Sequence, residues 1–306
     1  MSEFFSGEGF HPNLRRRARF VPRQAVSEAT LPIVRRLHAL SGWRRPSGVE
    51  VVSISREVRV RVHRPARSTG PVPGLLWIHG GGFVIGRAQQ DDALCSRFAN
   101  KLGILVAAVD YRLAPEHPFP EPLEDCYSAL NWLAGHHEID PTRLAIGGAS
   151  AGGGLAAALA LLVRDRGPIT PALQLLLYPM LDDRTVARAE VADRYRLWNA
   201  RSNRWGWASY LGDADPALAV PARNDDLTGV APAWIGVGTY DLFHDEVLTY
   251  AQRLRAAGVE CDVEVVAGAF HAFDLIAPSA PISRSFFARQ CESLLTAFDA
   301  GRGPAE

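Results

Sequence analysis

Residues 144–163 read LAIGGASAGGGLAAALALLV, and this segment gives the clearest indication of the fold. The apolar run LAIGG predicts a buried strand, and the residues from Leu155 onward have the apolar pattern of a helix. Ser150 lies between them in GASAG, residues 148–152, where all its neighbours are small. Small residues let a strand and a helix approach closely, as a nucleophilic serine on a sharp strand-to-helix turn requires. Taken alone, the pattern also fits a glycine-rich turn whose serine has no chemical role.

The sequence around this turn alternates between short apolar runs and helical patterns. Strands are predicted at 49–55, 58–63, 74–79, 104–109, 144–148, 173–178, 233–237 and 263–266. Helices are predicted between them at 91–102, 123–133, 155–166 and 246–257. Continuous apolar strands are typical of parallel sheets, and alternating strands and helices place helices on both faces of one sheet. We therefore predict an α/β fold with a mostly parallel sheet.

Two segments interrupt this alternation. The N-terminal residues 1–48 precede the first strand and have a helical pattern, and residues from about 183 to 215 form a helical segment rich in aromatic residues and arginine. Both fall outside the sheet, so we expect them to pack together as a helical cap. The predicted organisation is an N-terminal cap segment, 1–48, followed by a catalytic domain, 49–306, that carries the cap insertion.

Composition excludes several classes of function. The 33 basic residues balance 33 acidic ones, which gives no reason to expect nucleic acid or an anionic membrane as a partner. Lys101 is the only lysine, so a phosphate-binding loop ending in Gly-Lys-Ser/Thr cannot be present. The four cysteines are widely scattered, which favours reduced thiols. Without a signal-peptide pattern or an apolar run of about 20 residues, we expect a cytoplasmic protein.

A second glycine cluster, HGGGF at 79–83, follows an earlier predicted strand. Consecutive glycines let the backbone approach a substrate and direct N–H groups at it. Such donors stabilise the oxyanion of acyl transfer, and the N–H of Ala151, at the start of the predicted helix, is placed to do the same. A phosphate-binding turn is the alternative, but neither glycine cluster can be read as Gly-x-Gly-x-x-Gly.

A serine hydroxyl needs a base to take its proton, and the base needs an acid to fix its tautomer. In this fold the chain order is serine, then aspartate or glutamate, then histidine. Asp241 follows the predicted strand at 233–237, and His271 follows the strand at 263–266. Both residues therefore lie where the acid and the base are expected.

Neighbouring residues offer competing interpretations. Asp241 could act only as the N-cap of the next helix. Asp245 and Glu246 are rival carboxylates, but they fall inside the predicted helix and would point less readily to the site. His244 lies beside them, yet there is no His-Glu-x-x-His pattern and no second ligand cluster, so we expect neither a metal nor a cofactor.

Five motifs in this order resemble the bacterial hormone-sensitive-lipase-like (family IV) carboxylesterases of the α/β-hydrolase superfamily. They are HGGGF at 79–83, DYRLAPEHPFP at 110–120, GASAG at 148–152, DLFHDE at 241–246 and FHAF at 270–273. The resemblance covers the chain from about residue 49 to its C-terminus. It implies an α/β-hydrolase fold with an eight-stranded, mostly parallel sheet and a helical cap.

The same resemblance implies roles for individual residues. The expected catalytic triad is Ser150, Asp241 and His271; the oxyanion N–H groups come from Gly81, Gly82 and Ala151, and His79 braces the glycine loop. One departure is Ala149, where many members have Asp and others Thr, so the subgroup is not defined. Arg112 and Glu116 of the 110–120 motif are expected to pair and fix a proline-rich loop. A homodimer is also suggested by the resemblance alone.

These features predict a serine carboxylesterase that hydrolyses short- to medium-chain, uncharged esters through an acyl-enzyme. Its partner would be a small-molecule ester, and no cofactor would be required. An amidase or formamidase with the same triad is the first alternative. The second is a non-catalytic small-molecule receptor similar to the gibberellin receptors, which typically lack the triad histidine that is present here as His271.

Overall fold

One sheet organises the molecule. The computed structural model describes residues 9–24, 26–41, 48–68 and 70–300. Within this part, eight strands form a sheet in the order β1-β2-β4-β3-β5-β6-β7-β8. The strands are β1 Val49–Ser53, β2 Arg59–His63, β3 Val72–Ile78, β4 Leu105–Asp110, β5 Ile139–Ala149, β6 Leu173–Leu177, β7 Ala233–Tyr240 and β8 Cys261–Phe270. The pairs β1–β2 and β2–β4 are antiparallel, and the other neighbours are parallel. The predicted mostly parallel sheet is confirmed.

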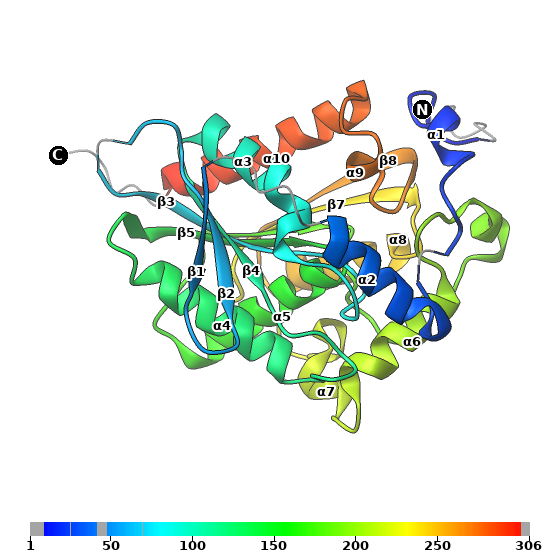
Figure 1. Cartoon of the computed structure of the whole chain (residues 1–306), viewed down its shortest axis with the longest axis horizontal. Coiled ribbons are helices and arrows are strands. Elements are labelled where there is room, and N and C mark those ends of the chain that lie inside the picture. Colours follow the sequence, from blue (N-terminus) through cyan, green and yellow to red (C-terminus); the bar gives the residue numbers. More distant parts are fainter. Residues whose placement is uncertain (1–8, 25, 42–47, 69, 301–306) are drawn as a thin grey trace.

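Helices cover both faces of this sheet (Figure 1). The main helices are α3 Asp92–Leu102, α4 Glu121–Ala134, α5 Ala151–Arg166, α8 His244–Ala256 and α10 Pro281–Ala300. Helices α3 and α10 lie on one face, and α4 and α5 lie on the other. Helix α5 is buried along almost its whole length because its small and aliphatic side chains pack against the central strands. Its first turn therefore has a fixed position relative to the end of β5.

The sheet differs from the sequence prediction mainly in strand length. Strand β5 begins at Ile139 instead of Leu144, because Ile139 pairs with Val72 ahead of a register shift in β3. Strand β8 extends through Phe270, where it still pairs with Tyr240 of β7. The polar residues Asp140, Thr142 and Arg143 interrupt the apolar run in the first extension, and Gly268 interrupts it in the second.

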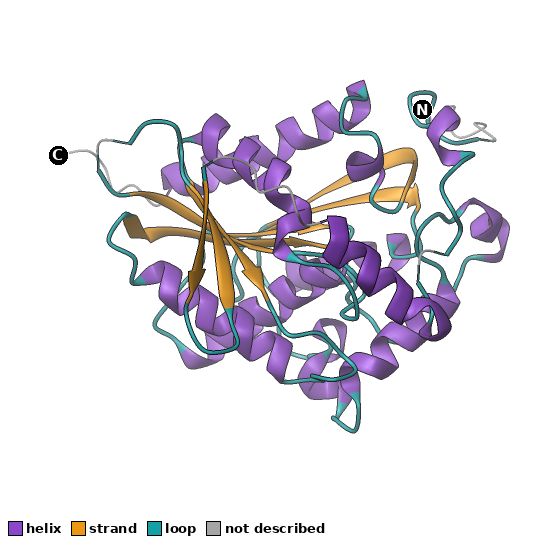
Figure 2. Ribbon diagram, in the orientation of Figure 1, coloured by secondary structure: helices purple, strands orange, loops and turns teal. Residues whose placement is uncertain are grey.

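The two segments predicted as a cap contact one another directly. In the N-terminal segment the helices are α1 Arg15–Ala18 and α2 Leu31–Ser41, with a 3-10 turn at Glu28–Thr30. In the insertion, helix α6 Ala200–Leu211 follows a 3-10 turn at Ala189–Arg194, so the insertion is less helical than predicted. Figure 2 shows long loops on both sides of these short helices. Residues 1–8 and 42–47 of the predicted cap lie outside the described residues.

Among the described residues, four hydrogen bonds join the two cap segments. The Leu197 N–H donates to the Pro22 carbonyl at 2.8 Å, and the Ser202 hydroxyl donates to the Val26 carbonyl at 2.9 Å. The Arg196 and Asn199 side chains donate to the carbonyls of Ala18 and Arg23, respectively.

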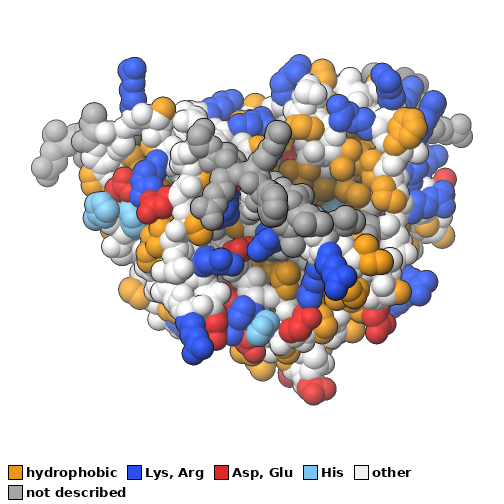
Figure 3. Space-filling model, in the orientation of Figure 1, with side chains coloured by type: hydrophobic (Ala, Val, Ile, Leu, Met, Phe, Trp, Pro, Cys, Tyr) orange, Lys and Arg blue, Asp and Glu red, His pale blue; other side chains and the backbone are white. Residues whose placement is uncertain are grey.

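In the view of Figure 3, basic side chains gather toward the edge of the molecule where α1 lies. In the part of the chain that the structure describes, no helix is long and apolar enough to cross a membrane.

Candidate active site

The carboxyl ends of three parallel strands bring together the three residues predicted as a triad. Ser150 follows β5, Asp241 follows β7 and His271 follows β8. The Ser150 Oγ lies 3.0 Å from Nε2 of His271, and Nδ1 of His271 lies 2.8 Å from Oδ2 of Asp241. All three side chains are buried. This unbroken line of hydrogen bonds can carry a proton from the serine hydroxyl to the imidazole.

The backbone of Ser150 has a positive φ of 56° with a ψ of −120°, a combination that residues with side chains rarely adopt. Its N–H donates to the Leu177 carbonyl at 2.9 Å, and its own carbonyl accepts from Gly154 and Met180 at 3.0 Å each. Glycine is required next to this turn because a Cβ on Gly152 would lie 2.1 Å from the Ile78 carbonyl oxygen. Tight packing of small residues therefore holds a strained serine at the start of α5.

The glycine loop at 79–83 lies beside this serine. A Cβ on Gly80 would be 3.3 Å from the Cβ of Ser150, so the two backbones are almost in contact. Gly81 and Gly82 have φ values of 131° and 59°, which residues with side chains rarely adopt. The N–H of Ala151, in the first turn of α5, has no partner within its own helix. These positions can therefore present several N–H groups to one oxygen near Ser150.

His79 is buried at the base of this loop. Its Nδ1 lies 2.9 Å from the Gly80 carbonyl oxygen, and its ring stacks on Tyr111 with centroids 4.3 Å apart. The Tyr111 hydroxyl also donates to the His79 carbonyl at 3.0 Å. These contacts fix His79 between the glycine loop and Tyr111.

The alternatives to Asp241 have other partners. The Asp241 Oδ1 accepts from the Phe243 N–H at 3.0 Å, so the carboxylate both supports the start of α8 and holds His271. Asp245 contacts His244 at 2.6 Å at the surface. Glu246 is buried and accepts from the Leu181 N–H at 2.6 Å, and burial raises the pKa of its carboxyl well above the usual value.

Sequence reasoning missed Tyr178, which contacts His271, and Asp274, which contacts Tyr178. The Tyr178 ring meets the imidazole edge-on with centroids 4.9 Å apart, and its hydroxyl donates to Asp274 Oδ1 at 2.9 Å. Burial raises the pKa of the Asp274 carboxyl. Asp274 lies only three residues after His271, and Tyr178 directly follows β6, so their positions relative to the strands were the available signals.

The expected pairing of Arg112 with Glu116 is wrong. Arg112 instead makes ion pairs with Asp125 at 2.7 Å and Glu121 at 2.6 Å, both on α4. Glu116 pairs with Arg35 of α2 at 2.7 Å. The proline-rich loop therefore joins two elements that are distant in sequence, and this could not be read from residues within the motif.

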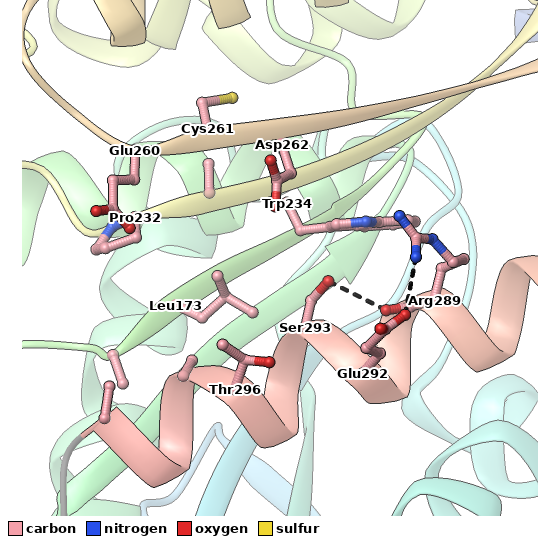
Figure 4. Close-up of a pocket in the computed structure, with 14 residues that line it drawn as sticks. Leu173, Pro232, Trp234, Glu260, Cys261, Asp262, Arg289, Glu292, Ser293 and Thr296 are labelled. Atoms are coloured by element: carbon pink, nitrogen blue, oxygen red, sulfur yellow. Dashed lines mark hydrogen bonds and ion pairs between the residues drawn. The ribbon is translucent and has the colours of Figure 1, made fainter.

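Neither a metal site nor a nucleophile at Ser293 is found among the described residues. Among the described residues, no group of three or more His, Cys, Asp or Glu could hold a metal ion. A separate cavity of about 530 Å³ lies between α10 and the amino ends of β6, β7 and β8, at the opposite edge of the sheet from Ser150 (Figure 4). There Arg289 pairs with Glu292, and the Ser293 hydroxyl donates to the Arg289 carbonyl of its own helix. Ser293 is therefore not arranged as a nucleophile.

Comparisons with known proteins agree with this geometry. A family model described as "alpha/beta hydrolase fold" matches residues 75–275. The carboxylic ester hydrolase LipN of Mycobacterium tuberculosis is 39% identical over 231 residues, 71% of this chain and 61% of its own length. The carboxylesterase NlhH of the same species is 33% identical over 242 residues, 73% of this chain and 74% of its own. The matches span less than two thirds of LipN and of esterase LipI, at 61% and 64%.

Solved structures extend the likeness to nearly the whole chain. A bacterial heroin esterase has a TM-score of 0.85 and 37% identity, covering 95% of this chain and 98% of its own. Esterase LipW from Mycobacterium marinum has a TM-score of 0.84 and 34% identity, covering 94% and 96%. The predicted fold class is confirmed by this agreement.

Proposed function

Because this chain belongs to the family of proteins with the alpha/beta hydrolase fold, we propose that it is a serine carboxylesterase with Ser150 as its nucleophile. The observation that carries the proposal is the line of hydrogen bonds from Asp241 through His271 to Ser150. Relatives named as carboxylic ester hydrolases and carboxylesterases support the ester as the bond that is cleaved.

In the first step, Nε2 of His271 takes the proton of the Ser150 hydroxyl as Oγ attacks the ester carbonyl carbon. The negative charge that develops on the carbonyl oxygen is stabilised by the N–H groups of Gly81, Gly82 and Ala151. Asp241 holds the imidazole in the required tautomer and stabilises the imidazolium that forms. The C–O bond to the alcohol then breaks, and the alcohol leaves with the proton from His271.

In the second step, His271 takes a proton from water, and the resulting hydroxide attacks the acyl-enzyme carbonyl. The same N–H groups stabilise the second oxyanion. Ser150 leaves with the proton from His271, and the carboxylic acid is released. Every proton is carried by His271, so the mechanism requires no metal or organic cofactor.

We further propose that the substrates are small, uncharged esters with short- to medium-chain acyl groups. The aromatic cap insertion and the zero formal net charge favour such substrates over strongly charged ones. A cytoplasmic location is proposed from the four buried free thiols, which suit a reducing compartment. The homodimer remains a prediction that size-exclusion chromatography with light scattering would test.

The proposed function is tested by hydrolysis of p-nitrophenyl esters of increasing acyl length, with the corresponding anilides assayed in parallel. Ser150→Ala should abolish turnover, and Ser293→Ala, which changes a serine bound to its own helix, should not. Greater activity on the anilides would favour an amidase. Near-normal activity of Ser150→Ala would contradict the mechanism, and failure of Ser150 to react with a fluorophosphonate probe would favour a non-catalytic binder.

A further inference from the structure

We propose that Trp198, in the cap insertion, is a positioning residue that fixes the oxyanion loop. The inference rests on the proposed function, because it assigns Trp198 to the same site. By holding Gly82 in place, the insertion would support the rate of the chemical step.

The indole of Trp198 lies directly against the backbone of Gly82. A Cβ on Gly82 would be 2.0 Å from Cη2 of the indole and 2.7 Å from its Cζ3. These distances are far below van der Waals contact, so the six-membered ring occupies the space that a side chain at position 82 would need. Gly82 cannot move toward the ring without a clash.

Trp198 itself is held firmly. Its side chain is buried, and its Nε1–H donates to Oδ1 of Asn203 at 3.1 Å. The preceding residue, Leu197, has a positive φ of 67° and donates its N–H to the Pro22 carbonyl. The following residue, Asn199, caps α6 by accepting from the N–H groups of Arg201 and Ser202. The indole therefore cannot swing away from the glycine loop without breaking these contacts.

Helix α6 confines the adjoining backbone as well. A Cβ on Gly206 would lie 3.0 Å from the Gly82 carbonyl oxygen, so the helix approaches the loop closely. The next residue, Phe83, has a φ of 66° and stacks on Tyr210 with ring centroids 4.2 Å apart. The Phe83 ring also packs against Trp207 at 5.0 Å. Gly82 and Phe83, the last two residues of the HGGGF motif, are thus held by α6 and by Trp198.

An external support is needed because glycines impose no conformation of their own. A glycine-rich loop samples positive and negative φ readily, whereas an oxyanion hole is effective only when its donors are fixed before the charge develops. Loss of one such donor lowers kcat about 100- to 1,000-fold, and a misplacement of about 1 Å can cost about 100-fold. Trp198 thus supplies the rigidity that the three glycines lack.

The test compares Trp198→Ala, Trp198→Leu and Trp198→Phe with wild type. We expect Trp198→Ala to lower kcat for p-nitrophenyl acetate about 10- to 100-fold with KM changed less than about threefold. Affinity for a trifluoromethyl ketone, whose adduct with Ser150 places an oxyanion in the same hole, should fall in parallel with kcat. Trp198→Phe removes the distal six-membered ring that contacts Gly82 but keeps an aromatic ring at this position, so both values should fall less than in Trp198→Ala without returning to wild type. Trp205→Ala is the matched control, because Trp205 is a half-buried tryptophan on α6.

Several outcomes would overturn the inference. Unchanged kcat in Trp198→Ala would do so, as would a change confined to KM or acyl-length preference, which would make Trp198 a pocket wall. A loss explained by the folded fraction in thermal melts would show a structural role only. If Trp198→Ala does not fold, the Leu and Phe variants decide by the same criteria. Loss of the proposed function itself is recognised separately, as a wild type without esterase activity or with activity independent of Ser150.

Discussion

Ser150 combines backbone strain with complete use of its backbone hydrogen-bonding groups. A positive φ at a residue with a side chain costs of order 1–3 kcal/mol and persists only where the surroundings enforce it. Here β6 accepts from its N–H, and Gly154 and Met180 donate to its carbonyl. The hydroxyl is thereby fixed toward His271 before any substrate binds.

Asp241→Asn should lower kcat about 10,000-fold with little change in KM, since an amide no longer fixes the tautomer of His271. Steady-state kinetics on a p-nitrophenyl ester measures the effect. Asp245→Asn serves as the control, because this exposed carboxylate four residues further on contacts His244 instead. An Asp241→Asn variant within tenfold of wild type would exclude Asp241 as the acid of the triad.

The buried carboxyl of Asp91 should make the stability of the protein depend on pH. Burial raises the pKa of its carboxyl from 3.8 to about 7, while Trp77 donates to it at 2.8 Å. The folded protein therefore binds more protons than the unfolded chain between about pH 4 and pH 7. The free energy of unfolding should fall as the pH rises through this window, and above it the cost of the ionised Asp91 should stay constant.

Asp91→Asn removes this ionisation and can keep the hydrogen bond to Trp77. We expect the variant to gain stability relative to wild type as the pH rises from 4 to 7, by at most about 4 kcal/mol, since a tenfold change in proton affinity is worth about 1.4 kcal/mol. Urea melts of both proteins at a series of pH values measure the difference. Parallel stability curves across this range would refute the assignment.

At the residue scale, sequence reasoning succeeded where position along a strand was sufficient. Asp241 and His271 each come a few residues after an apolar run, so they could be placed at the same edge of the sheet. Trp198 and Arg35 act through contacts with segments more than 45 residues away in sequence, at Gly82 and Val84. Such contacts depend on how the cap packs, which apolar periodicity does not determine.

At the scale of elements, the side chain of Arg35 joins α2 to the loops near Ser150. Arg35 donates to the carbonyls of Val84 at 2.9 Å and Ala114 at 2.7 Å, and it pairs with Glu116 at 2.7 Å. Two of these partners are backbone groups next to the glycine loop and in the proline-rich loop. Helix α2 is therefore attached to the segment that immediately follows the glycine loop at 79–83.

Arg35→Ala should reduce the free energy of unfolding by about 2 kcal/mol, because it leaves two carbonyls without their charged donor. It should also lower kcat, since Val84 is close to Gly82. Thermal melts and ester kinetics measure the two effects, with Arg36→Ala as the control on the exposed side of the same helix. Equal behaviour of the two variants would argue against this attachment.

Elements of the sheet were predictable because β6 and its neighbours are buried on both faces and read as continuous apolar runs. The cap insertion was not. Its residues 183–199 are mostly irregular because Arg188, Arg194 and Arg196 bond to carbonyls and hydroxyls of other segments instead of lying along a helix. The content of aromatic residues and arginine distinguished this segment from the sheet region. It did not predict that residues 183–199 are mostly irregular.

At the scale of the whole molecule, the four cysteines report on global unfolding. All are free and buried, and burial raises the pKa of each thiol. A thiol reagent such as dithionitrobenzoate should react with fewer than one group per native chain and with all four in denaturant. Rapid labelling of a thiol in the native protein would contradict the buried placement.

The hydrogen bonds between the two cap segments have a consequence for divergence between homologues. The acceptors on the N-terminal side are backbone carbonyls, those of Ala18, Pro22, Arg23 and Val26. Carbonyls are unchanged when side chains are substituted, so this segment can drift in sequence while its path over the insertion persists. We therefore expect substitutions of the side chains at these four positions to leave the hydrogen bonds to the insertion in place.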